Sequence, residues 1–239
     1  MRINKLALTN FRSYNSLELD LEPGVITFIG DNGSGKTNIA ESLIYLAFLS
    51  SHRVANNVPL ISLGNQQAII RAEVQRDERT LQIDLEINAS KANRARINGN
   101  PTRSQRELLG AIQIVYFSPE DLDLVRGEPG NRRDFLDRLL ITRTPRLAGV
   151  IADYERVVKQ RNALLKTRTS AAALVPWNEQ LIKLGAELTA ERIALVDVLN
   201  PWVAKNYANL NEVKPASISY KCSTEGVTKN IDDNIAALT

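Results

Sequence analysis

Residues 1–90 alternate between apolar and polar positions with the period of two that is typical of β-strands. One alternating stretch runs from Ile3 to Leu8 and another from Leu17 to Leu21. The run Val25–Ile29 is apolar on both faces, which predicts a strand buried in the centre of a sheet. From Ile39 to Leu49 the apolar residues recur at helical spacing. The pattern therefore predicts a strand, a glycine-rich loop and a helix in succession.

Two further alternating segments, QAIIRAEVQR and RTLQIDLEIN, flank Asp77 and Glu78 and predict a hairpin. The segment RARINGNPT contains an Asn-Gly turn at residues 98–99. A strand is expected over 112–117, followed by a helix start with Ser118 as N-cap and Pro119 at the first helical position. The first part of the chain is thus expected to combine sheet and helix.

From about residue 128 the pattern becomes helical. One apolar stripe runs from Leu147 to Leu165 and another from Leu181 to Leu199, with a loop expected over 167–176 and Pro201 between helical stretches. Helices joined in this way pack as an antiparallel pair. The segment PASISYKCS reads as a strand. We expect an α/β fold with a head lobe over 1–125, a helical arm over 126–212 and a return to the head lobe over 213–239.

Composition excludes several kinds of site. The 239 residues include one cysteine, Cys222, and one histidine, His52, which argues against a disulfide framework, a zinc site or a Cys-His catalytic pair. The longest apolar stretch, Leu43–Leu49, is far shorter than a membrane span, and the N-terminus has no signal-peptide core. We expect a cytoplasmic protein that does not enter membranes.

The segment GDNGSGKT fits the phosphate-loop pattern G-x-x-x-x-G-K-[ST]. Glycines let backbone N–H groups turn toward phosphate oxygens, Lys36 supplies a positive charge, and the hydroxyl of Thr37 can bind Mg²⁺. The strand before it and the helix after it favour ATP binding over a structural glycine turn. The candidate cofactor-binding residues are Gly30, Asp31, Asn32, Gly33, Ser34, Gly35, Lys36 and Thr37.

Hydrolysis requires more than this loop, because an acidic residue at a strand end normally holds Mg²⁺ and positions water. No such strand is evident. The acids of IVYFSPED belong to a helix start, and Asp197 in IALVD lies on a helical stripe. The catalytic set is therefore expected to be incomplete in this chain.

Positive charge is concentrated in residues 126–168. This window has eleven Lys and Arg against five acids, a net charge of +6, so the remainder carries −3 of the total +3. A basic helical lobe suits binding to DNA phosphates. Helices also need charged outer faces, and the interleaved acids can form local pairs, so solvated surface is the alternative. With few aromatic residues here, base stacking is expected to be minor.

Several segments together resemble the bacterial RecF family of recombination and repair ATPases. They are LALTNFRSY at 6–14, GDNGSGKTN at 30–38, SHR at 51–53, INGN at 97–100, VYFSPEDLDLVRGEPGNRRDFLD at 115–137 and YERVVKQRNALLK at 154–166. The resemblance implies a P-loop head of the ABC/SMC type with mixed sheets and an inserted helical lobe. It also implies ATP-dependent homodimerisation, binding to gapped or single-strand/double-strand junction DNA, and help to recombination mediator proteins that load recombinase during replication, repair and the SOS response.

The same resemblance implies roles for further residues, and the chain differs from the family pattern in its length. Arg12 occupies a place where related heads bring a basic residue to the nucleotide phosphates, and Arg53, beside His52, is expected near the phosphate or DNA face. The DNA-binding candidates are Arg53, Arg132, Arg133, Lys159, Arg161, Lys166 and Arg168. Arg132 and Arg133 could instead pack against the head. Family members continue beyond this length with a signature motif and the magnesium-binding aspartate, so the chain is expected to be truncated at its C-terminal end, with weak ATPase activity or none.

Two other functions stay open at this point. Many P-loop kinases begin in the same way, which makes a small-molecule phosphotransferase an alternative. Such an enzyme needs a mobile arginine-bearing lid, whereas the basic residues here lie on long helices with apolar stripes. The third possibility is a scaffold whose loop no longer binds nucleotide.

Overall fold

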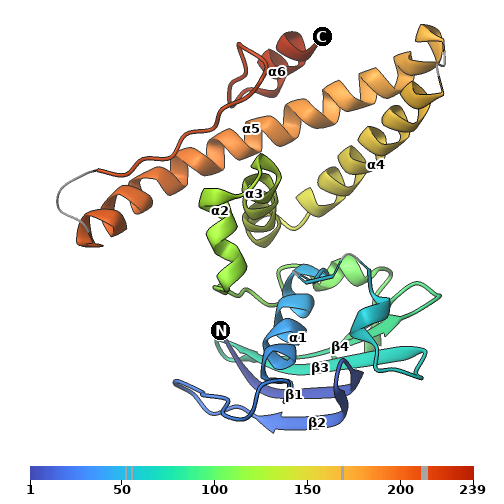
Figure 1. Ribbon diagram of the computed structural model, residues 1–239, viewed down its shortest axis with the longest axis vertical. Coiled ribbons are helices and arrows are strands. Elements are labelled where there is room, and N and C mark those ends of the chain that lie inside the picture. Colours follow the sequence, from blue (N-terminus) through green and yellow to red (C-terminus); the bar gives the residue numbers. More distant parts are fainter. Residues whose placement is uncertain (52, 55, 168–169, 211–214) are drawn as a thin grey trace. The chain divides into compact units, whose positions relative to one another are not determined.

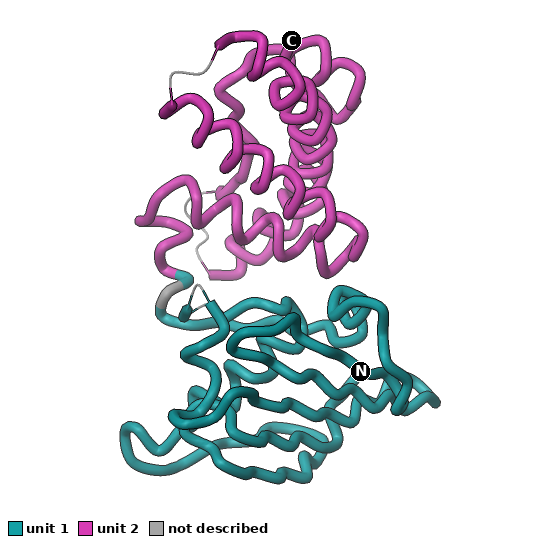
Figure 2. Tube along the Cα trace, turned by 90° about the vertical axis from the view of Figure 1, so that its right-hand side faces the viewer, with its two compact units in different colours: residues 1–121 teal, residues 122–239 magenta. Residues whose placement is uncertain are grey.

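The computed structural model describes residues 1–51, 53–54, 56–167, 170–210 and 215–239, with only the backbone described at Glu120. The chain forms two compact units, residues 1–121 and residues 122–239 (Figure 2). The predicted sites at His52 and Arg168 lie outside the described residues. Within the described residues, no helix is both long enough and apolar enough to cross a membrane.

Unit 1 is built on one six-stranded sheet with the order β2-β1-β3-β4-β5-β6, in which every pair of neighbours is antiparallel. Short 3-10 segments cover 58–60, 105–108 and 119–122. The other elements of this unit are β1 (Arg2–Phe11), β2 (Tyr14–Asp20), α1 (Lys36–Phe48), β3 (Gln67–Arg76), β4 (Arg79–Asn88), β5 (Arg94–Ile97) and β6 (Asn100–Pro101).

The alternation of the strands gives the sheet one covered face, where α1 packs (Figure 1). Leu6 and Leu8 of β1 and Ile70 of β3 are at most 1% exposed and belong to the same cluster as Tyr45 and Leu46 of α1. The residues between them along each strand are more exposed, as expected for a sheet with one solvated face. The period of two therefore decides which side chains form the core.

The predicted turns of unit 1 are confirmed. β3 and β4 pair along their whole lengths around the turn at Asp77. Asn98 and Gly99, at φ +51° and +79°, connect β5 to β6. Both central residues of such a two-residue turn need positive φ, which Asn and Gly adopt at low cost. The helix start at Pro119 is also confirmed, with Ser118 N–H and Oγ both donating to Asp121 Oδ2, at 2.6 and 3.2 Å.

Three predicted strands are wrong. Val25–Ile29 is not part of the sheet, and Val25 and Ile29 are 97% and 91% exposed. The predicted strand over 112–117 is likewise outside the sheet, with Ile112 in an isolated bridge to Leu109 and Val115 fully exposed, and residues 215–222 contain no strand. The pattern indicates what these side chains prefer, but a buried strand also needs partner strands at its edges. Among the described residues, no strand of the sheet pairs with these segments.

Unit 2 consists of helices, among which α4 and α5 form the predicted antiparallel pair (Figure 1). Arg146 contacts Glu187, Tyr154 lies against Gly185, and Arg161 bonds to Asn178, so the numbering rises along one helix as it falls along the other. The elements are α2 (Asp123–Arg126), α3 (Pro129–Arg143), α4 (Leu147–Lys166), α5 (Ala171–Leu210) and α6 (Ile231–Leu238).

α5 is longer than expected, because residues 171–176 of the predicted loop are helical and Pro201 lies inside the helix. Proline removes one backbone hydrogen bond, a loss that the 40-residue helix α5 tolerates at Pro201. Residues 215–239, where we expected a return to the head lobe, instead contact α5. The fully buried Asn234 donates to Ala186 O at 3.1 Å, and the Ile218 N–H donates to Asn200 Oδ1 at 2.9 Å.

A nearly buried ion pair joins α3 to α5. Arg192 Nε and Nη2 donate to the two carboxylate oxygens of Asp137 at 2.8 and 2.6 Å, and the side chains are only 9% and 13% exposed. Burial disfavours the charged guanidinium, but the hydrogen bonds and charge of Asp137 outweigh it and raise the pKa of Arg192. The pair fixes the rotation of α3 against α5.

Arg192→Ala should lower the free energy of unfolding of unit 2 by about 3–5 kcal/mol, because it leaves Asp137 buried without its partner. Urea unfolding followed by circular dichroism measures this loss. The control is Arg146→Ala, since Arg146 is 61% exposed and its pair with Glu187 is screened by solvent, so the loss should be much smaller. Equal losses in the two variants would contradict the proposed difference.

Candidate phosphate-binding site

The loop between Ile29 and α1 has a backbone that requires glycine. Gly33 and Gly35 have φ values of +86° and +100°, a region that other residues enter only at a cost. A Cβ on Gly35 would lie 2.7 Å from Tyr14 Oη and 2.8 Å from Ser13 Oγ. The loop therefore packs against the turn between β1 and β2 at a distance that only glycine permits.

Lys36 closes this loop on itself. Its ammonium donates to the carbonyl oxygens of Gly30 and Asp31, both at 2.7 Å, and lies 3.4 Å from Ser34 Oγ. The Ser34 N–H donates to Asp31 O at 3.2 Å. Gly30 to Lys36 thus form a ring of backbone with a positive charge held inside it.

The amino-terminal end of α1 is uncapped and faces this ring. Its N-cap residue is Gly35, no side chain accepts a hydrogen bond from the first turn, and that turn contains no acidic residue. The first backbone N–H groups of a helix carry partial positive charge and need acceptors. Together with the Lys36 ammonium they form a site suited to a phosphate group.

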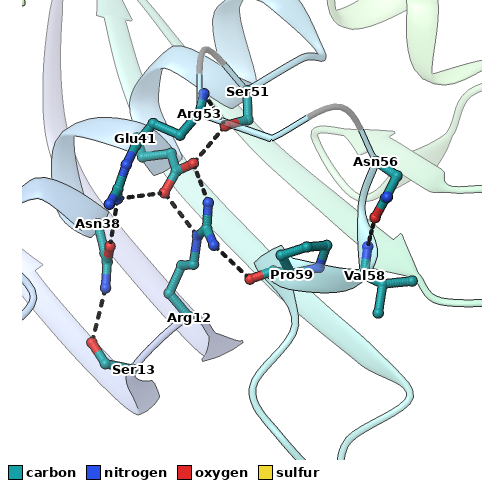
Figure 3. Close-up of polar contacts among 9 residues, drawn as sticks. All are labelled: Arg12, Ser13, Asn38, Glu41, Ser51, Arg53, Asn56, Val58 and Pro59. Carbon is teal, nitrogen blue, oxygen red and sulfur yellow. Dashed lines mark hydrogen bonds and ion pairs between the residues drawn. The ribbon is translucent and has the colours of Figure 1, made fainter.

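Glu41 lies on α1 and is fully buried, where it binds two arginines (Figure 3). Arg12 Nη2 and Nε donate to its two oxygens at 2.6 and 2.8 Å, and Arg12 Nη1 donates to Pro59 O at 2.8 Å. Ser51 Oγ donates to Glu41 Oε1 at 2.5 Å. Arg53 Nη1 lies 3.4 Å from Glu41 Oε2 and 3.3 Å from Asn38 Oδ1.

The surroundings of Glu41 keep its carboxylate charged. Burial alone would raise its pKa, but hydrogen bonds from Arg12 and Ser51 and the charges of Arg12 and Arg53 outweigh it, so the pKa of Glu41 lies below its usual value. A carboxylate with a depressed pKa stabilises the folded state above its unfolded pKa. That contribution is lost as the pH falls through the folded pKa. The cluster is therefore fully formed at neutral pH.

The structure brings some predicted residues of unit 1 together. The loop residues Gly30–Thr37 are contiguous, and Thr37 is exposed. Arg12 and Arg53 meet on Glu41. The guanidinium of Arg12 is largely engaged in unit 1, and its contact with nucleotide phosphates stays a prediction.

The predicted DNA-binding residues of unit 2 differ in their contacts. Arg132 Nη1 donates to Leu124 O and Gly127 O at 3.2 and 3.1 Å, which ties α2 to α3, and Arg161 Nε donates to Asn178 Oδ1 at 2.7 Å. Arg133, Lys159 and Lys166 are exposed. The first two residues have structural roles, whereas the last three present their charges to solvent.

Glu41 was not predicted from the sequence, although one signal was present. It is the single acidic residue of α1, in the second turn of an otherwise largely apolar helix. A charge at a core position needs partners, and Arg12 follows the first strand. The spacing of Glu41 from Arg12 in sequence does not reveal that the two residues meet.

The loop, the uncapped helix and the sheet together define a P-loop ATPase fold. The model of the AAA ATPase domain family matches residues 1–170. Since this is more than half of the chain, the chain belongs to the AAA ATPase domain family.

The resemblance to RecF is confirmed by curated relatives. A "DNA replication and repair protein RecF" from Streptomyces avermitilis is 47% identical over 95% of this chain and 64% of its own length. Its counterpart from Kineococcus radiotolerans is 50% identical over 84% of this chain and 54% of its own length. The chain therefore spans roughly half to two thirds of these relatives.

Solved structures confirm the α/β P-loop fold. "The recombination mediator protein RecF-ATPrS in RecFOR pathway" superimposes with a TM-score of 0.83 at 24% identity, over 88% of this chain and 58% of that one. The corresponding RecF-ATP structure gives a TM-score of 0.79 at 22% identity, over 99% and 66%. At these identities the similarity establishes the fold.

Gly35→Ala should destabilise unit 1 more than Gly33→Ala. An added Cβ at Gly33 meets nothing within 4 Å, so that variant bears only the backbone strain, about 1–2 kcal/mol. At Gly35 the same strain is joined by overlap with Tyr14 and Ser13, which adds about 1–3 kcal/mol. Urea unfolding of both variants measures the difference, and equal losses would show that the loop does not pack closely against Tyr14.

Proposed function

We propose that this chain binds ATP through Gly30–Thr37 and is the nucleotide-responsive part of a DNA-binding repair protein. The observation that supports this most strongly is the position of the Lys36 ammonium inside the loop, beside an uncapped helix end. An entering phosphate offers Lys36 anionic oxygens in exchange for two neutral carbonyl oxygens. A hydrogen bond between the ammonium and an anionic oxygen is stronger than one between the ammonium and a neutral carbonyl oxygen, so the exchange favours binding.

The donor set also fits a magnesium nucleotide. Mg²⁺ usually retains several waters and takes phosphate oxygens with one or two protein ligands. Thr37, at the start of α1 and exposed, is the candidate protein ligand. Glu41 is not a second ligand, because its oxygens accept hydrogen bonds from Arg12 and Ser51. When bound, the ion would neutralise phosphate charge.

We expect binding without appreciable hydrolysis. Phosphoryl transfer to water needs a group that orients the water. Among the described residues, no group of three or more His, Cys, Asp or Glu is arranged to hold a metal ion. ATP would therefore act as a bound ligand in this chain.

The relatives' names suggest the process. RecF relatives are described as DNA replication and repair proteins, and the solved structures place RecF in the RecFOR pathway as a recombination mediator. By this similarity we propose binding to gapped or junction DNA, ATP-dependent pairing of two heads, and cooperation with other mediator proteins in recombinase loading. Arg133, Lys159 and Lys166 are the best placed DNA contacts of unit 2, because they are exposed.

No observation favours the phosphotransferase alternative. An arginine-bearing lid would need arginines free to move toward the nucleotide. Arg132 and Arg161 are instead bonded within the helices of unit 2.

ATP should bind the wild-type chain, and Lys36→Ala should weaken binding by about a hundredfold or more, because it removes a charged partner of the phosphates. Isothermal titration calorimetry with Mg²⁺-ATP measures both affinities. Lys91→Ala, at an exposed lysine elsewhere in unit 1, is the matched control and should bind as wild type does. Absence of binding by the wild type would refute the proposed function and leave the scaffold hypothesis.

Affinity for gapped duplex DNA should fall steeply with salt if Lys159 and Lys166 contact phosphates. Each contact adds about 0.9 to the slope of log affinity against log salt, so the double alanine variant should have a slope smaller by about two. Fluorescence anisotropy at several salt concentrations gives the slopes, with Lys91→Ala again as control. An unchanged slope in the double variant would exclude these lysines as DNA contacts.

A further inference from the structure

The two arginines on Glu41 are held very differently (Figure 3). Arg12 is 16% exposed and donates through Nε, Nη1 and Nη2, at 2.6 to 2.8 Å. Arg53 is 41% exposed and reaches Glu41 only through Nη1, at 3.4 Å. Its Nε and Nη2 find no partner among the residues that the structure describes. The guanidinium of Arg12 is thus firmly held by three hydrogen bonds. The guanidinium of Arg53 is held weakly, and its Nε and Nη2 are available to donate.

Arg53 is also held beside the phosphate loop. Its Nη1 lies between Asn38 Oδ1 and Glu41 Oε2, at 3.3 and 3.4 Å, and these residues are three apart and so share one face of α1. Asn38 directly follows Thr37 and donates to Ser13 Oγ at 3.0 Å, next to the packed turn below Gly35. The Arg53 guanidinium therefore lies within about one helical turn of the uncapped amino end of α1.

Glu41 connects the segment bearing Arg53 to this helix. Ser51 Oγ donates to Glu41 Oε1 at 2.5 Å and accepts from the Arg53 N–H at 3.0 Å. Ser51 therefore bonds to the Glu41 carboxylate directly, and Arg53 is linked to it both through its own side chain and through Ser51. The charge of the carboxylate is largely balanced by Arg12, which leaves Arg53 with a weak hold that an anion can compete with.

We propose that Glu41 is a positioning residue that holds Arg53 ready to donate to the phosphate chain of a nucleotide in the Gly30–Thr37 loop. This inference rests on the proposed nucleotide binding. Arg53 contributes the charge, and Glu41 acts only through it. In this arrangement Arg12 fixes the Glu41 carboxylate.

A double-mutant cycle on the full chain tests this assignment. Glu41→Gln, Arg53→Ala and the double variant are titrated with Mg²⁺-ATP by calorimetry. Each single change should weaken binding about tenfold, the loss of one charge-assisted hydrogen bond, while the double variant should fall within about twofold of Arg53→Ala alone. Independent, multiplying losses, or a Glu41→Gln chain that binds as wild type, would overturn the proposal.

Two controls separate positioning from stability. Tyr45→Phe removes buried hydrogen bonds to Asn57 and Asn93 from the same helix, so it should lower the unfolding temperature and leave ATP affinity unchanged. If Glu41→Gln does not fold, Glu41→Asp retains the charge on a shorter side chain, and its loss of affinity should vanish in the Arg53→Ala background. A loss that persists there overturns the assignment.

The outcome also distinguishes this inference from the proposed function. If wild type binds ATP and Lys36→Ala does not, but the cycle shows no coupling, nucleotide binding stands and the role of Glu41 is refuted. If wild type does not bind ATP, both are refuted.

Discussion

The phosphate loop depends on the buried ion pair between Arg12 and Glu41. An anion site at a helix end needs the first N–H groups of that helix left open, so the helix cannot be held there by a capping side chain. α1 is instead held further along, where Glu41 takes two bonds from Arg12 at the end of β1. Removing one partner of such a pair would leave a buried charge, which is why the contact constrains the helix firmly. The Arg12–Glu41 ion pair therefore allows the amino end of α1 to remain uncapped.

The same contact explains why the glycines matter. Because Arg12 fixes the β1–β2 turn relative to α1, Ser13 and Tyr14 lie directly under Gly35 and leave no room for a side chain. The backbone must then turn through positive φ at Gly33 and Gly35 before the helix begins. The motif thus supplies a positive charge for phosphate binding, through Lys36. It also permits the close contact of Gly35 with Ser13 and Tyr14, which cannot be read from the motif itself.

The sequence pattern predicted local elements well, but it predicted the tertiary contacts between distant residues poorly. The β3–β4 hairpin, the Asn98 turn and α1 follow from alternation, turn chemistry and helical spacing, all of which act over a few residues. The loop was predictable for the same reason. Glu41 was not, because its contact with Arg12, 29 residues away, and its burial are tertiary properties. Pro201 was expected to separate two helical stretches, but α5 continues through it, since the loss of one hydrogen bond does not end a helix of this length.

The run Val25–Ile29 shows the limit of such reasoning most clearly. Its β-branched and aromatic residues favour an extended backbone and a covered surface, and the backbone leads directly into the loop. Covering such a strand requires hydrogen-bonded neighbours, which the six strands of the described sheet do not provide. The loop is nevertheless formed, since Lys36, Gly35 and the Arg12–Glu41 pair hold it from the helix side. Its geometry therefore depends on α1 and β1, and not on a paired strand before the loop.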